Sequence, residues 1–180
     1  MGVKRDKSAS LALSGVVLFL VTILFVAPLV HEWFHLWMLD IAGCQEVSHE
    51  YNFDGLYGFS GIIEFECSND ETSIGYGIVY AAGYVGTLVV GVYILGVCLL
   101  LMLLGLHKEA ILVSPVGSGF VLSSCTGFVQ RDGELAVALS YLGLDCLKGF
   151  LPVIGFSLFL GCLAYLWMEL MLAFRDVRGG

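Results

Sequence analysis

Positive charge is scarce in this chain. Its 180 residues include 8 Lys and Arg against 16 Asp and Glu, and no Lys or Arg lies between Lys7 and Lys108. A nucleic-acid-binding surface needs clustered Lys and Arg, so this pattern excludes that class of partner. Charged residues of both signs make up only 13% of the chain, against roughly a quarter in an average soluble domain.

Hydrophobic residues, by contrast, make up 58% of the chain, and its mean hydropathy is +0.91. A soluble core of this size cannot bury so much apolar surface, which excludes a disordered chain and an ordinary cytosolic enzyme. We expect one all-α integral membrane domain in the lipid bilayer. Uncharged runs predict about four transmembrane helices, at residues 11–39, 74–106, 110–144 and 149–174. Within the third, residues 135–144 either continue the helix or form a separate part-buried helical segment.

The loop at residues 44–72 is different in kind, because it holds seven acidic residues and no basic one. Residues 47–53 and 60–66 are rich in aromatic and β-branched side chains, and the turn signal Asp54-Gly55 lies between them. We therefore expect a β-hairpin between the first and second spans. Cys44 and Cys67 bracket it and form a possible disulfide if the loop faces an oxidising compartment.

The other four cysteines lie singly in apolar runs, where we expect small buried side chains. These are Cys98, Cys125, Cys146 and Cys162.

The basic residues predict the orientation of the spans. Six of them fall on one side of a four-span arrangement, namely Lys4, Arg5, Lys7, Lys108, Arg175 and Arg178. The opposite side receives Lys148 and Arg131. The positive-inside rule then places both termini in the cytoplasm and the hairpin outside.

The clearest chemical motif is His31-Glu32-Trp33-Phe34-His35, at the end of the first span. On a helix, His31 and His35 share one face and both reach a single metal ion, while Glu32 lies beside it as a general base. The composition predicts only roughly 0.004 chance matches to this pattern. Ionisable side chains at membrane depth are also costly and indicate function. Interfacial histidines with no ligand are the simpler alternative.

A catalytic zinc site usually has a third protein ligand. The candidates are Asp40, His49, Asp54, Asp132, Glu134, Asp145 and Glu169. Asp132 is our choice, because it lies 23 residues after Glu109 in a span parallel to the first, which matches the depth of the two histidines. Glu134 matches that depth nearly as well.

Three features together resemble the site-2 protease family of intramembrane zinc metalloproteases, and its minimal M50B-like branch most closely. They are the H-E-x-x-H motif, the later Ala82-Gly83-Tyr84-Val85-Gly86 segment, and Asp132-Gly133. The resemblance covers roughly residues 15–145. It implies that His31, His35 and Asp132 bind Zn²⁺, that Glu32 is catalytic, and that a hairpin precedes the second core helix.

The resemblance implies an endopeptidase that cleaves a transmembrane or juxtamembrane segment of a membrane protein or peptide. Gly83, Tyr84 and Gly86 are the candidate substrate-binding residues, through unwound backbone near Tyr84, although small residues at this spacing more simply indicate close helix packing. Pro28 is expected to kink the first span and admit water.

Two alternatives to proteolysis stay open. Tyr84 and Arg131 stand where the family usually has other residues, which favours a non-proteolytic metal-binding or scaffold protein. A small transporter is the third class, since intramembrane acids also mark ion paths.

Overall fold

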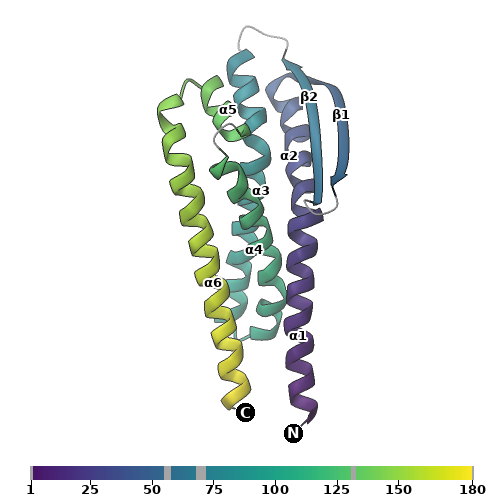
Figure 1. The fold of residues 1–180 in the computed structure, drawn as a ribbon, viewed down its shortest axis with the longest axis vertical. Helices are drawn as coiled ribbons and strands as arrows, with labels where there is room; N and C mark the ends of the chain where they lie inside the picture. Colours follow the sequence, from purple (N-terminus) through teal and green to yellow (C-terminus); the bar gives the residue numbers. More distant parts are fainter. Residues whose placement is uncertain (1, 55–57, 68–71, 131–132, 180) are drawn as a thin grey trace.

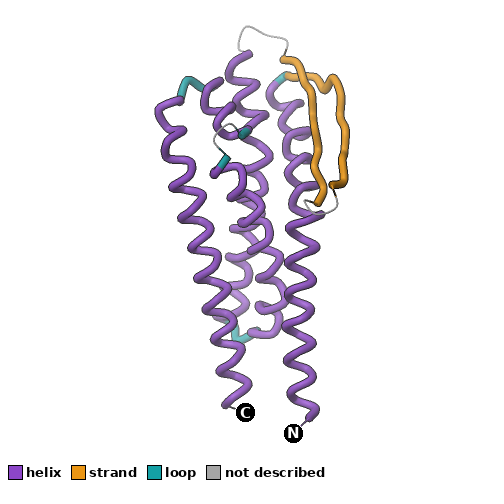
Figure 2. The backbone as a smooth tube through the Cα atoms, in the orientation of Figure 1, coloured by secondary structure: helices purple, strands orange, loops and turns teal. Residues whose placement is uncertain are grey.

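In the computed structural model, the residues that the structure describes are 2–54, 58–67, 72–130 and 133–179. The chain is mostly helical, with one small antiparallel hairpin (Figures 1 and 2). The elements are α1 (Gly2–Val21), the π-helical turn η1 (Thr22–Val26), α2 (Ala27–Ala42), β1 (Cys44–Asp54), β2 (Gly58–Cys67), α3 (Thr72–Leu103), α4 (His107–Val129), α5 (Glu134–Tyr141), the 3-10 turn η2 (Asp145–Phe150) and α6 (Leu151–Gly179).

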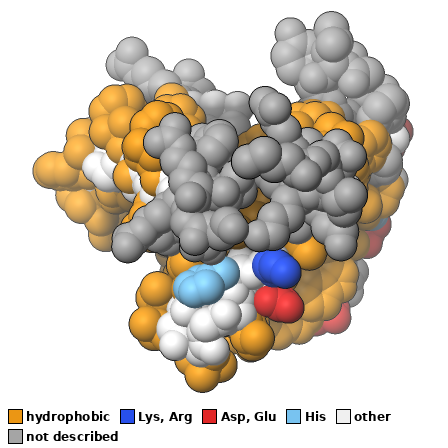
Figure 3. Space-filling view, turned by 90° about the horizontal axis from the view of Figure 1, so that it is seen from below, with side chains coloured by type: hydrophobic (Ala, Val, Ile, Leu, Met, Phe, Trp, Pro, Cys, Tyr) orange, Lys and Arg blue, Asp and Glu red, His pale blue; other side chains and the backbone are white. Residues whose placement is uncertain are grey.

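Four helical segments are long and apolar enough to cross a membrane, as the sequence predicts. They are Leu13–Ala42, Ile74–Leu103, His107–Val129 and Asp145–Met168. The two termini lie at one end of the bundle, and the hairpin base and α5 lie at the other (Figure 1). The described surface at the terminal end is largely hydrophobic (Figure 3).

Helix α4 is the central helix of the bundle, packing against α1, α3 and α6. More than half of its apolar window is buried inside the protein (56%), against 11–17% for the other three segments. Small residues make this possible, because they let neighbouring backbones approach closely. The buried small polar and glycine positions of α4 are Ser114, Gly117, Ser118, Gly119, Ser124 and Gly127.

The first span is one continuous helix whose regular hydrogen bonding is interrupted by η1 just before Pro28. Proline has no N–H to donate to the carbonyl one turn earlier, and a π-helical turn is one way to accommodate that loss. The backbone N–H of Ala27 instead donates to Thr22 O, five residues back. The irregularity expected at Pro28 is therefore a wider turn that precedes it.

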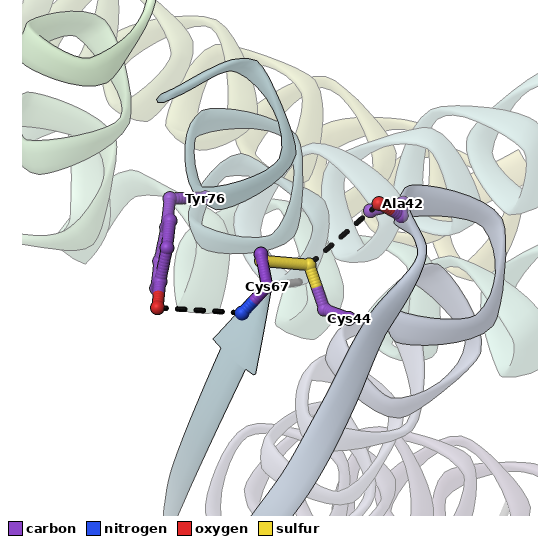
Figure 4. Close-up of a disulfide and its surroundings, with 4 residues drawn as sticks. All are labelled: Ala42, Cys44, Cys67 and Tyr76. Atoms are coloured by element: carbon purple, nitrogen blue, oxygen red, sulfur yellow. Dashed lines mark hydrogen bonds between the residues drawn. A yellow bond between two sulfur atoms is a disulfide. The ribbon is translucent and has the colours of Figure 1, made fainter. Parts of the chain in front are cut away.

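The expected hairpin is present. Strands β1 and β2 pair in antiparallel register from Cys44↔Cys67 to Asp54↔Gly58, with an irregularity between Glu46 and Ser48. A disulfide joins Cys44 to Cys67 at its base (Figure 4). The hairpin packs on α2 through a cluster that contains Leu39, Val79, Ile63 and Phe65 together with the cysteines.

The third predicted span is not a single helix. Helix α4 ends at Val129, and α5 begins at Glu134 as a separate eight-residue helix with three buried side chains, Leu135, Ala136 and Ala138. Of the four cysteines expected to be buried, Cys98, Cys125 and Cys162 are buried, but Cys146 is exposed. The expectation for Cys146 is wrong because η2, which carries it, has no buried residue.

Candidate metal centre

Helix α2 brings the two histidines of the H-E-x-x-H motif to the face that packs on α3. Residues four apart lie on one side of a helix, so their imidazoles point the same way. The two Nε2 atoms, of His31 and His35, are 3.0 Å apart. The side chains are 12% and 6% exposed, respectively.

Glu134, the first residue of α5, completes the cluster. Its Oε2 atom lies 3.1 Å from the Nε2 atoms of both His31 and His35. Burial alone raises the pKa of Glu134, but the hydrogen bonds and charges of the two imidazoles outweigh it and lower the pKa to about 2. The carboxylate side of the cluster is the open one, because the Glu134 side chain is 39% exposed.

The hydrogen bonding of His35 shows which of its ring nitrogens faces the cluster as a lone-pair donor. Its Nδ1 atom lies 2.7 Å from the backbone carbonyl oxygen of Val79 on α3. A carbonyl oxygen only accepts, so Nδ1 carries the hydrogen and donates it. In the neutral ring, Nε2 then has a lone pair directed at the cluster, which is the arrangement that outer hydrogen bonds impose on metal-binding histidines.

The geometry of the three atoms fits a small cation. The two imidazole nitrogens and one carboxylate oxygen form a triangle with sides of 3.0–3.1 Å. His31, His35 and Glu134 would be the residues that hold such an ion, and their imidazole nitrogens and carboxylate oxygen are of the kinds that bind Zn²⁺. Among the described residues, His31, His35 and Glu134 form the one group of three His, Cys, Asp or Glu side chains that could hold a metal ion.

Glu32, next to His31 in α2, lies against strand β2 of the hairpin. Its side chain is buried, at 7% exposure. A Cβ atom added to Gly61 of β2 would come within 2.6 Å of Glu32 Cγ and closer still to the carboxyl carbon. Tyr51 is the cross-strand partner of Gly61. Partial burial raises the pKa of Tyr51, and the charge of Glu32 adds to the effect. The hairpin therefore covers Glu32 with Gly61, a residue that has no side chain.

The three candidate substrate-binding residues of α3 are packing residues in this structure. A Cβ atom at Gly83 would lie 2.5 Å from His31 Nε2, and one at Gly86 would meet the ring of Phe34. The ring of Tyr84 packs edge-on against His31, with 4.3 Å between centroids. Helix α3 is continuous through this region, so the expectation of unwound backbone near Tyr84 is wrong.

The predicted third ligand, Asp132, lies outside the described residues. Of the other candidates, Asp40 is exposed at the end of α2. His49 Nδ1 is 3.7 Å from Glu46 Oε1 in the hairpin, and Asp145 Oδ1 is 2.8 Å from Lys148 Nζ. Asp54 and Glu169 are described only as parts of β1 and α6. Glu134 is the candidate that the structure brings to the histidines.

Two contributors were not identified from the sequence. Val79 acts through its backbone carbonyl, which no side-chain pattern reveals. Gly61 acts by having no side chain, and its strand pattern predicts a hairpin without predicting what the hairpin covers. No family model, curated protein or solved structure matches this chain.

Proposed function

We propose that this chain is a zinc-dependent intramembrane endopeptidase with His31, His35 and Glu134 as the metal ligands. The observation that carries the proposal is the triangle of ligand atoms beside the buried Glu32. A His/His/Glu set is one of the established ligand sets of catalytic zinc, and it leaves the fourth position for water. The resemblance of the motifs to site-2 proteases supports the same reaction.

A bound zinc ion would supply Lewis acidity to a water molecule and to the carbonyl of the scissile peptide bond. Glu32 is the general base in this proposal, accepting the proton of the attacking water and passing it to the leaving amine. Glu134 and His31 would bind the metal ion and orient it in the site. His35 is held in its binding tautomer by the Val79 carbonyl.

The substrate of this proposal is a transmembrane or juxtamembrane segment that unwinds locally. The cluster lies where helices α2 and α3 pack together, and a peptide bond inside a helix is closed to attack because its carbonyl is hydrogen-bonded. The hairpin beside Glu32 is able to receive an extended segment by strand addition. Water reaches the site from the Glu134 side, where exposure is greatest.

The full chain, purified in detergent, tests the proposal through metal content and cleavage of a fluorogenic transmembrane peptide. Glu32→Gln is the informative variant, because it removes the base and leaves all three ligands. We expect zinc at one ion per chain in both proteins, and a roughly 10²–10⁴-fold loss of cleavage in the variant. Unchanged cleavage, or wild-type protein without zinc, would contradict the proposal.

A second candidate function is a membrane metal-binding or scaffold protein without protease activity. The position of Gly61 favours it, because strand β2 lies directly on Glu32 and covers the proposed base. This alternative predicts zinc bound at one ion per chain and no turnover of any membrane peptide, with equal metal affinity in wild type and Glu32→Gln.

A further inference from the structure

Four aromatic rings connect the hairpin to α5 at the end of the bundle that carries the metal centre. They are Phe65 of β2, Tyr76 and Tyr80 of α3, and Tyr141 of α5. We call these four residues the aromatic bridge. Phe65 lies 5.2 Å from Tyr76 and 5.3 Å from Tyr80 between ring centroids. Tyr141 stacks on the same two rings, at 5.2 and 5.9 Å. All four distances are within the range of favourable aromatic pairs.

The two middle rings make this a connection rather than two separate contacts. Tyr76 and Tyr80 are one turn apart on α3 and so share a face. Each of them touches both Phe65 and Tyr141. A displacement of Phe65 therefore changes the surface on which Tyr141 stacks.

Helix α5 depends on such contacts for its position. It has only eight residues, and helices of this length do not persist without tertiary packing. Its backbone approaches α3 at Gly77, where an added Cβ would lie 3.1 Å from Ala138 O and 2.7 Å from Leu142 Cγ. Gly77 and the aromatic bridge together provide the contacts that pack α5 against α3.

The two ends of α5 make different contacts: one end reaches the metal centre, and the other end reaches the aromatic rings of α3. Glu134 and Tyr141 are seven residues apart, which is about two helical turns. Glu134, at the N-terminal end of α5, contacts the two histidines, while Tyr141, at its C-terminal end, stacks on Tyr76. Tilting or sliding of α5 at Tyr141 consequently moves the Glu134 carboxylate away from His31 and His35.

The hairpin end of the bridge is itself fixed. The disulfide between Cys44 and Cys67 closes the hairpin base, and the backbone N–H of Cys67 donates to the hydroxyl of Tyr76 at 3.4 Å (Figure 4). Phe65 is two residues from Cys67 on the same strand. The disulfide and this hydrogen bond thus fix the part of the hairpin from which Phe65 contacts α3.

We infer that the aromatic bridge positions the metal ligand Glu134, so that Phe65 and Tyr141 are positioning residues through which the hairpin holds α5 against the two histidines. This inference rests on the proposed function in taking Glu134 as a ligand. It adds that the hairpin, which also covers Glu32, controls the affinity of the metal centre through α3 and α5.

Binding of Co²⁺, measured by competition with a chelator on the full chain in detergent, tests the inference. Tyr141→Ala and Phe65→Ala are each expected to weaken binding about tenfold, at the lower end of the range for outer partners of metal ligands. Tyr141→Phe keeps the ring and should bind Co²⁺ within about twofold of wild type, on the ring-stacking argument. Tyr93→Ala changes an exposed tyrosine of the same helix α3 and is the matched control.

The double variant Phe65→Ala/Tyr141→Ala distinguishes a connection from two local effects. A connection predicts a loss no greater than that of the weaker-binding single variant, whereas independent losses that multiply overturn the inference. Hydrogen exchange provides a readout without metal, and Phe65→Ala should speed exchange in the peptide containing residues 134–141.

The outcomes separate this inference from the proposed function. Normal Co²⁺ binding by wild type with unchanged affinity and exchange in Tyr141→Ala overturns the bridge alone. Failure of wild type to bind Co²⁺ overturns the metal centre itself, and with it this role of the bridge.

Discussion

His35 donates its Nδ1 hydrogen to the backbone carbonyl of Val79, 2.7 Å away on the neighbouring helix. The acceptor belongs to the backbone of a continuous helix, so side-chain substitution at Val79 does not remove it. The ring orientation and tautomer of His35 are consequently set by the packing of α2 on α3. The same packing places Gly83 against both imidazoles. The geometry of the histidine ligands therefore depends directly on how α2 packs against α3.

Glu134→Gln should weaken Zn²⁺ binding by more than about a hundredfold, because loss of a ligand exceeds the 10–100-fold typical of outer partners. The amide keeps the size of the side chain but not its charge. Asp132→Asn is the matched variant, removing the carboxylate two residues earlier in the sequence, and should retain the wild-type affinity. Chelator competition gives both affinities. Tight binding by Glu134→Gln together with loss in Asp132→Asn would restore Asp132 as the third ligand.

Gly83→Ala should abolish metal binding. The added methyl would lie 2.5 Å from His31 Nε2 and closer still to His35 Nε2, so the imidazoles or the helices must move apart. Gly96→Ala in the same helix has nothing within 4 Å of the added methyl and should bind metal normally. It should be slightly more stable, by about 0.5–1 kcal/mol, since alanine is the better helix former. Equal zinc content in the two variants would contradict this packing.

Gly61→Ala is expected to leave metal binding intact and to reduce cleavage. A Cβ at this position collides with the carboxyl group of Glu32 and not with a proposed ligand. Either Glu32 or strand β2 must therefore shift, and a small misplacement of a catalytic group is costly. The measurement is the cleavage rate at saturating zinc, with Glu50→Ala, an exposed change in the same hairpin, as the control. A rate equal to that of Glu50→Ala would show that Glu32 has room to adjust.

Cys146 should report the orientation of the chain in the membrane. It is exposed in η2, at the end of the bundle opposite the termini, while Cys98, Cys125 and Cys162 are buried. The distribution of Lys and Arg predicts that this end lies outside the cell. A membrane-impermeant maleimide should label intact cells, and Cys146→Ser should remove the signal. Labelling only after permeabilisation would reverse the orientation.

The sequence predicts the spans and the histidine pair because both depend on local patterns, an uncharged run and a four-residue spacing. It favours Asp132 over Glu134 as the third ligand on membrane depth alone, since counting residues gives depth and not the direction of a side chain. The break after Val129 and the new start at Glu134 determine that direction. The contact of Gly61 with Glu32 depends on how the hairpin packs on α2, which is a property of the folded chain.

The π-helical turn at Thr22–Val26 also has a consequence for the register of the first span. A π turn is in effect a one-residue insertion into an α-helix, and each residue rotates the helix by about 100°. The segment before it packs on α4 and the segment after it packs on α3. Deleting one residue within this turn would convert it to an α-helical turn and keep the rotation of the two flanking segments, so both imidazoles would still face α3. Deleting one residue of α2 before His31 would instead rotate both imidazoles by about 100° away from α3.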